Sequence, residues 1–191
     1  MSEILILASA SPRRARILRA LGVPFRVTVT GADETLFPDE EAGAAAERLA
    51  RAKAACVIGE RLPVLAADTL VTCQGRILGK PRDAAEAAEM LRLLSGRVHE
   101  VVTGVCLDAG GRAVSGVERT SVTFAVLGAA EVEWYVATGE PLDKAGAYHV
   151  DGRGSAFIEA IEGSPSNVAG LPVRLLLKLA KQAGVDLGIP C

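Results

Sequence analysis

Two serines and two arginines gather near the start of the chain. Ser9, Ser11, Arg13 and Arg14 lie within the segment LASASPRRARILRALG, residues 7–22, directly after an apolar run. A serine followed by proline is typical of a helix start, where free backbone N–H groups and the helix dipole favour an anion. Hydroxyl and guanidinium groups at that point suit a phosphate. A capped surface helix with solvated arginines is the other interpretation, and the segment has no glycine-rich phosphate loop.

An aspartate in the middle of an apolar segment is the second candidate. Asp68 lies in LAADTLV, residues 65–71, within or at the end of an expected strand. Because an unpaired buried carboxylate is costly, Asp68 is expected to face a metal, a cation or a catalytic task, unless it merely caps a turn at the strand end. Asp33 and Glu34 in GADET could join it around Mg²⁺, which takes one or two carboxylates with phosphate oxygens and water.

Three isolated lysines stand beside acidic or glycine-rich turns. They are Lys53 in an alanine-rich segment, Lys80 in LGKPRD, and Lys144 in LDKAGAY, where little could cover its charge. Together they favour a polyphosphate site. The two histidines, His99 and His149, have no serine or cysteine partner pattern, so no hydrolytic triad is expected and both are interpreted as structural.

These side chains need a scaffold that brings distant segments together. Apolar and alternating runs predict strands, with a hairpin around AGGR, at 3–8, 24–30, 62–73, 99–108 and 113–127. Helical patterns and caps, including a capping box from Asp83 and Glu86, predict helices over 12–21, 44–58, 83–95, 130–138 and 172–183. Tyr148, beside the glycine-rich segment, is expected to face a ligand. Early alternation of strands and helices and a late hairpin predict a mixed-sheet α/β fold, with residues 1–191 as a single domain.

Charge and composition exclude several classes of protein. The 191 residues carry a formal charge of −2, which argues against a polybasic nucleic-acid or membrane binder. The N-terminus lacks the basic region of a signal peptide, and the apolar C-terminal run is interrupted by charges, so no membrane span is expected. Four cysteines at 56, 73, 106 and 191, with no metal-binding or CxxC spacing, fit a reducing compartment. A cytoplasmic location is therefore expected.

Five stretches together resemble one family. LASASPRR, ADTLV, GKPRDAAEAAEMLRLLSGRVHEVVTGV, GEPLDKAGAY and IEGSPSNVAGLP, in this order over about residues 5–175, are similar to the Maf family of nucleoside triphosphate pyrophosphatases. DKAGAY in particular resembles the branch that acts on dTTP and UTP. The resemblance implies an elongated mixed β-sheet flanked by helices, related to inosine triphosphatases, with two lobes around a central cleft. It also implies frequent assembly as a homodimer. No nucleic-acid or membrane partner is expected, on the grounds of charge given above.

The implied reaction cleaves a nucleoside triphosphate between its α- and β-phosphates, releasing a nucleoside monophosphate and pyrophosphate with Mg²⁺ or Mn²⁺. By motif match, Asp68 would activate water and Glu34 would join it at the metal. The residues that the match implies for holding the triphosphate are Ser9, Arg13, Lys53 and Lys80, with Arg13 and Thr69 tied to substrate choice. Arg14 and Lys144 are further candidates for the substrate, because Arg14 belongs to the serine–arginine segment and Lys144 is one of the three isolated lysines. All of this requires Asp68, Glu34 and the Ser9–Arg14 segment to converge on a common cleft.

The chain departs from the dTTP/UTP branch at Asp151 in HVDGRG, where that branch usually has glutamine. A glutamine amide both donates and accepts, matching the carbonyls and N3–H of uracil or thymine, whereas an ionised aspartate only accepts. We hypothesise that Asp151 weakens this preference or moves it towards bases that present donors, such as cytosine or guanine.

Two alternatives stay open. One is the same chemistry on a modified or inosine-type purine nucleotide. The other is a nucleotide-binding regulator of cell division with little turnover, because the family has also been described as inhibiting septum formation. Release of pyrophosphate separates an enzyme from a regulator.

Overall fold

The computed structural model describes residues 4–190, and the chain divides into two compact units. Unit 1 comprises the chain up to Asp68, Thr103–Glu118 and the chain from Gly170; unit 2 comprises Thr69–Val102 and Arg119–Ala169. Within residues 4–190 the strands form a seven-stranded mixed sheet, in the order β2-β1-β3-β5-β6-β7 with β4 paired to β3. The predicted mixed α/β class is therefore confirmed. Strands belonging in part to each unit are β3 (Val64–Cys73), β5 (Val98–Ala109) and β6 (Arg112–Phe124).

The sheet of unit 1 is parallel at its first strands. Strand β1 (Leu5–Leu7) lies between β2 (Phe25–Val27) and β3 and runs parallel to both. The register sets Leu7 opposite Leu65. Every residue of β1 is buried, as its unbroken apolar sequence predicts for a strand covered on both faces.

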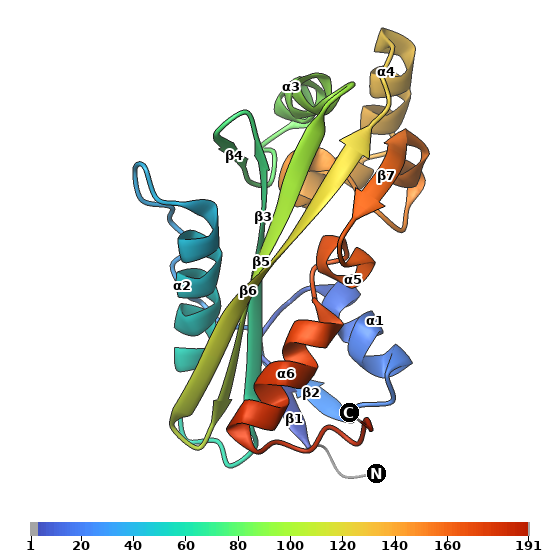
Figure 1. Cartoon of the computed structure of the whole chain (residues 1–191). Coiled ribbons are helices and arrows are strands. Elements are labelled where there is room, and N and C mark those ends of the chain that lie inside the picture. The colour runs from blue at the N-terminus through green and yellow to red at the C-terminus, as the bar shows by residue number, and fades with distance from the viewer. Residues whose placement is uncertain (1–3, 191) are drawn as a thin grey trace. The chain divides into compact units, whose positions relative to one another are not determined.

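Helices cover both faces of this sheet (Figure 1). Helix α2 (Ala42–Ala55) packs on the face that carries Ile6, Ala66 and Cys106. Helices α1 (Pro12–Ala20) and α6 (Val173–Ala183) pack on the other face, formed by alternate strand residues that include Leu7 and Leu65. Ser11 caps α1 as predicted, its side chain accepting the N–H of Arg14, and α6 ends before Gly184.

Helix α2 lies unusually close to strand β5. A Cβ atom at Gly104 would stand 2.2 Å from the backbone oxygen of Ala46, a distance that real Cβ atoms do not reach. Glycine on the strand therefore lets the two backbones come into contact. The hydroxyl of Ser115 on β6 also donates a hydrogen bond to Glu47 on the same helix. These contacts fix α2, which carries Lys53, against the sheet.

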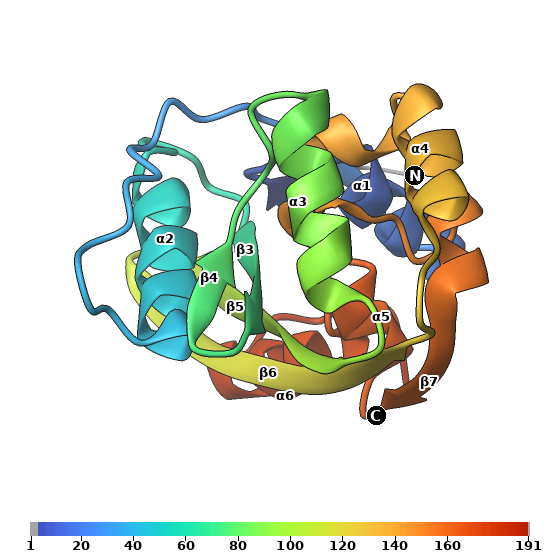
Figure 2. The ribbon, with the colours of Figure 1, turned by 90° about the horizontal axis from the view of Figure 1, so that it is seen from above.

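Unit 2 surrounds a second core. Here β3 turns at Gln74–Gly75 into the antiparallel strand β4 (Arg76–Leu78), and β6 pairs antiparallel with β7 (Ile158–Glu162). Helices α3 (Ala84–Leu94) and α4 (Ala129–Ala137) lie side by side (Figure 2), followed by the short α5 (Pro165–Val168). Neither β4 nor β7 is predicted by the sequence pattern, because each is short and β7 carries charges.

The start of α3 differs in one detail from the predicted capping box. Asp83 accepts the N–H of Glu86 at 2.9 Å, as expected of an N-cap. The carboxylate of Glu86 reaches the N–H of Arg82 at 2.7 Å instead of that of Asp83. The reciprocal hydrogen bond therefore falls one residue earlier than in a standard capping box.

An aromatic cluster in unit 2 encloses His99. Its Nε2 lies 3.0 Å from the hydroxyl of Tyr148, and the ring packs edge-on against Phe124. Burial lowers the pKa of His99 to about 4 and raises the pKa of Tyr148. This supports the structural interpretation of His99. The expectation that Tyr148 faces a ligand is wrong, because only 5% of its surface is exposed.

Among residues 4–190, none of the helices has both the length and the apolar character that crossing a bilayer requires.

Candidate active site

The ammonium group of Lys53 joins two carboxylates in unit 1. Its Nζ lies 2.5 Å from Asp68 Oδ1 and 2.8 Å from Glu34 Oε1. Lys53 comes from the last turn of α2, Asp68 from the middle of β3, and Glu34 from the segment between β2 and α2. The structure thus brings together three of the predicted site residues that are far apart in the sequence.

Burial gives this cluster its electrostatic character. Only 7% of Asp68 and 7% of Lys53 is exposed, whereas 54% of the Glu34 side chain is exposed. Taking a single charge out of water costs several kcal/mol. The charges of Lys53 and Asp68 can both be buried because each neutralises the other. The alternative that Asp68 only caps a turn is wrong, since it lies inside a strand and pairs with a cation. Glu34 is the member that water or a ligand can reach.

The turn from β1 into α1 is held by Arg14. Its Nη1 donates to Ser9 Oγ at 3.0 Å and its Nε donates to the carbonyl of Gly170 at 2.8 Å. Ser9 Oγ also accepts the N–H of Ser11 at 3.2 Å. Arg14 therefore ties the end of β1 to the segment that leads into α6, and it also explains why Ser9 is buried. Direct binding of phosphate by Arg14 stays a prediction.

Electrostatics links this turn to the lysine cluster. Burial lowers the pKa of Arg14 to about 10, while the negative charges of Asp68 and Glu34 act in the opposite direction. The guanidinium group is thus charged at neutral pH and lies within the field of both carboxylates. Because β1 ends while the parallel strand β3 continues, the chain leaves the sheet at Ser9 beside the part of β3 that leads to Asp68. Arg13, on the same first turn of α1, is partly buried.

Unit 2 carries the remaining predicted residues. Lys80 is exposed, whereas Lys144 is 9% exposed and pairs with the carboxylate of Asp143. The expectation that little could cover the charge of Lys144 is therefore wrong. The N–H of Gly146 donates to the carbonyl of Gly79 at 3.1 Å, which joins the two lysine-bearing loops within unit 2. Thr69 follows Asp68 on β3 and is partly buried.

The segment that carries Asp151 is organised by Tyr135 and Glu140, neither of which was predicted to be a site residue. Glu140 accepts hydrogen bonds from the hydroxyl of Tyr135 at 2.8 Å and from the N–H groups of Arg153 and Gly154, each at 3.2 Å. Burial opposes ionisation of Glu140, but these hydrogen bonds outweigh it, so the pKa of Glu140 lies below its usual value. Asp151 itself is exposed. The only sequence signal for this arrangement was the presence of Glu140 in the GEPLDKAGAY stretch.

The carboxylates of Glu34 and Asp68 suit a hard cation whose other ligands are substrate oxygens and water. Within residues 4–190 no group of three or more histidine, cysteine or carboxylate side chains could hold a metal ion. Glu34 and Asp68 nevertheless both contact one positive group, the ammonium of Lys53. Two carboxylates fit Mg²⁺ when phosphate oxygens and water complete the shell. Asp33, predicted to join them, instead accepts the N–H and the hydroxyl of Thr35 at 2.9 and 2.6 Å, within its own turn.

Comparison with known proteins places this arrangement in a family. The family model described as Maf-like protein matches residues 4–183, and the chain belongs to the Maf family. A dTTP/UTP pyrophosphatase of Anaeromyxobacter sp. (strain Fw109-5) is 53% identical to it, over 98% of this chain and 93% of that protein. The dTTP/UTP pyrophosphatase of Myxococcus xanthus is 50% identical, over 96% and 94%, and that of Bacillus cereus (strain AH820) is 46% identical, over 96% and 97%. The structure of the Staphylococcus aureus Ham1 protein aligns with a TM-score of 0.43 and 14% identity, over 63% of this chain and 71% of that one.

Proposed function

We propose that this protein hydrolyses nucleoside triphosphates, dTTP and UTP among them, between the α- and β-phosphates. Water is consumed, and the products are a nucleoside monophosphate, pyrophosphate and a proton. The observation that carries the proposal is the buried Lys53–Asp68 pair with Glu34 beside it, in a Maf-family chain about half identical to dTTP/UTP pyrophosphatases.

Asp68 is the residue we assign to the proton of the attacking water. Attack on a phosphorus of a highly charged substrate needs an oriented water and neutralisation of charge more than covalent help. A carboxylate held in one position by Lys53 supplies a proton acceptor with a fixed direction. The proton of the water goes to Asp68, the new bond forms between water oxygen and phosphorus, and pyrophosphate leaves with the electrons of the broken P–O bond.

Glu34 and Asp68 are the residues we assign to Mg²⁺ or Mn²⁺, which, when bound, neutralises phosphate charge. The exposed side of Glu34 supports this role, because a cation with water and phosphate ligands needs open space around its protein ligands. Lys53, Ser9, Arg13 and Arg14 are the residues we assign to the triphosphate, for which they supply donors and positive charge. Lys80, Lys144, Thr69 and Asp151 are further residues that we assign to the substrate.

We assign the reaction to the cytoplasm. Cys56, Cys73 and Cys106 are free thiols in the structure, which fits a reducing compartment; Cys191 lies outside the described residues. Assembly as a homodimer is a further expectation, which sedimentation of the purified protein tests.

The experiment is a panel of purified nucleotides: dTTP, UTP, CTP, GTP, ITP and 7-methyl-GTP. Each is incubated with the protein and either Mg²⁺ or Mn²⁺, and pyrophosphate and nucleoside monophosphate are quantified. We expect equimolar release of both products, dependent on the metal. Nucleotide binding without pyrophosphate from any member of the panel would overturn the enzyme assignment and favour the regulator of cell division.

A further inference from the structure

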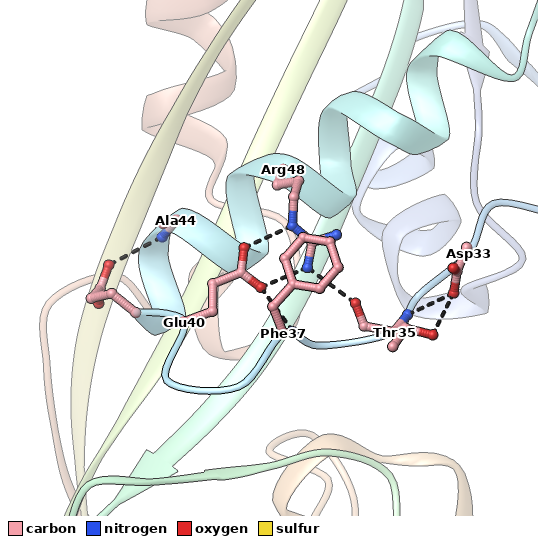
Figure 3. A network of polar contacts seen from close by, with 7 residues as sticks. Asp33, Thr35, Phe37, Glu40, Ala44 and Arg48 are labelled. Atoms are coloured by element: carbon pink, nitrogen blue, oxygen red, sulfur yellow. Dashed lines mark hydrogen bonds and ion pairs between the residues drawn. The ribbon is translucent and has the colours of Figure 1, made fainter.

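The loop that carries Glu34 is anchored by a single arginine. Residues 31–41, between β2 and α2, contain neither helix nor strand, yet Glu34 within them must meet Lys53. Figure 3 shows Arg48 projecting from α2 towards this loop, with Thr35, Phe37 and Glu40 around its guanidinium group. The anchor therefore begins at the residue directly after Glu34.

Three kinds of contact hold the guanidinium group of Arg48. Its Nε and Nη2 donate to the two oxygens of Glu40 at 2.7 and 2.6 Å. Nη2 also donates to the carbonyl of Thr35 at 3.1 Å. The Cζ atom of Arg48 lies over the Phe37 ring, 4.1 Å from its centre. A bidentate carboxylate pair, a carbonyl contact and a cation–π contact therefore converge on one side chain.

The loop is also tied to itself through the same arginine. The N–H of Phe37 donates to Glu40 Oε2 at 3.3 Å, the oxygen that Arg48 holds. The Glu40 side chain is 13% exposed and that of Arg48 is 31% exposed, so water screens this ion pair less than one on an open surface. Removal of the guanidinium group would thus release Thr35, Phe37 and Glu40 together.

Arg48 and Lys53 both belong to α2, five residues apart. One helix therefore carries the lysine that contacts Glu34 and the arginine that contacts the loop beside it. Lys53 sets the position of Asp68 and Glu34 oxygens, and Arg48 sets the path of the backbone next to Glu34. We propose that Arg48 is a positioning residue for Glu34, holding its carboxylate where it completes the cation site with Asp68. This inference rests on the proposed function, since it gives Glu34 its task there.

Lysine cannot replace arginine in this position. An ammonium group has no planar fork for two carboxylate oxygens and no flat face for an aromatic ring. Arg48→Lys keeps the charge and loses the geometry, whereas Arg48→Met loses both. Arg51→Met is the matched control, because Arg51 is on the same helix and its ion pair is with Glu47, outside the loop.

The test measures binding of Mn²⁺, by electron paramagnetic resonance, in the presence of a non-hydrolysable α,β-methylene analogue of UTP. We expect Arg48→Met and Arg48→Lys to weaken Mn²⁺ binding about 10-fold or more, the usual effect of removing a residue that orients a metal ligand. Arg51→Met should bind as the wild type does. Hydrogen exchange of the Phe37 amide should accelerate in both Arg48 variants only.

A double variant decides whether Arg48 acts through Glu34. In a Glu34→Gln background, Arg48→Met should weaken Mn²⁺ binding no further, because the oriented carboxylate is already gone. Equal weakening in both backgrounds, or unchanged Mn²⁺ binding in Arg48→Met, would overturn the proposal. If Arg48→Met fails to fold, Phe37→Ala removes only the ring contact and should shift binding in the same direction by a smaller factor. A wild-type protein that binds Mn²⁺ with the analogue but releases no pyrophosphate would refute the hydrolase alone.

Discussion

Lys53 Nζ and Asp68 Oδ1 lie 2.5 Å apart, and each side chain is about nine-tenths buried. Lys53 comes from the last turn of helix α2 and Asp68 from the middle of strand β3. In such a pair each charge offsets the burial of the other, so changing one residue alters the environment of its partner. Variants of the two residues can therefore separate an effect on chemistry from an effect on stability.

Replacement of Asp68 by asparagine should remove the proton acceptor and leave the fold intact. An amide oxygen still accepts the hydrogen bond from Lys53, and Glu34 remains as a counter-charge. We expect turnover to fall by about 10²- to 10⁴-fold, the contribution typical of a general base, with most nucleotide affinity retained. Pyrophosphate release and calorimetric binding are the measurements. Asp33→Asn is the control, since the hydrogen bonds of Asp33 are with Thr35 in its own turn. Wild-type turnover in Asp68→Asn would mean that the base is another residue.

Replacement of Lys53 by methionine should destabilise the protein. Asp68 would stay buried without its cation, which typically costs about 3–5 kcal/mol in the free energy of unfolding. Urea denaturation at neutral pH measures the loss. Adding Asp68→Asn to Lys53→Met should recover part of it, because the orphaned charge is then gone. If both variants lose the same stability, the ion pair is not the source.

Replacement of Asp151 by glutamine should change the preferred base without changing stability, because Asp151 is exposed. The amide offers a donor to the carbonyls of uracil and thymine, so the ratio of kcat/KM for UTP to that for CTP should rise by a factor on the order of ten, about the value of one hydrogen bond. The same nucleotide panel measures it. Glu159→Gln, which removes a carboxylate from exposed β7, should leave the ranking as it is. An unchanged ranking in Asp151→Gln removes this residue from base selection.

The buried His99 should make stability depend on pH in the acid range. Its pKa falls from the ordinary 6.5 to about 4 in the folded protein, chiefly through burial. The unfolded chain therefore binds a proton between pH 6.5 and 4 that the folded chain does not, and stability is lost as the pH falls through this window. The loss amounts to roughly 3 kcal/mol at most.

Thermal unfolding from pH 7 to 4.5 measures this effect. His99→Gln, which does not titrate, should flatten the dependence. Tyr148→Phe should retain it, because burial and not the hydroxyl is the main cause. An equally steep dependence in His99→Gln would assign the effect to other groups.

Local signals predicted the helix starts well. Ser11 caps α1 and Asp83 caps α3, because a capping side chain acts within three residues of itself. Helix α2 begins at Ala42 instead of 44, because the Glu41 side chain accepts the N–H groups of Gly43 and Ala44. Glutamate is not among the preferred caps, so this start had no signal.

Contacts between residues far apart in the sequence could not be predicted, because helix and strand patterns report only on neighbouring residues. Nothing near Lys53 in the sequence indicates that its ammonium group is buried, since its partner Asp68 lies on another element. The contact from Arg14 to Gly170 joins residues at opposite ends of the chain. The anchor between Arg48 and Glu40 spans eight residues, a spacing for which no helix or strand rule exists. The family resemblance predicted Lys53 and Asp68 to be site residues, and the structure shows that the two are in contact.

The absence of a side chain at Gly104 sets how closely α2 packs on the sheet. Lys53 and Arg48 both lie on this helix, so any change in its distance from the sheet moves the ammonium group and the loop anchor together. A larger side chain at Gly104 would therefore displace Lys53 and Arg48 together while touching neither. Any loss of activity in such a variant would come from displacement of the whole helix and not from a lost contact with the substrate.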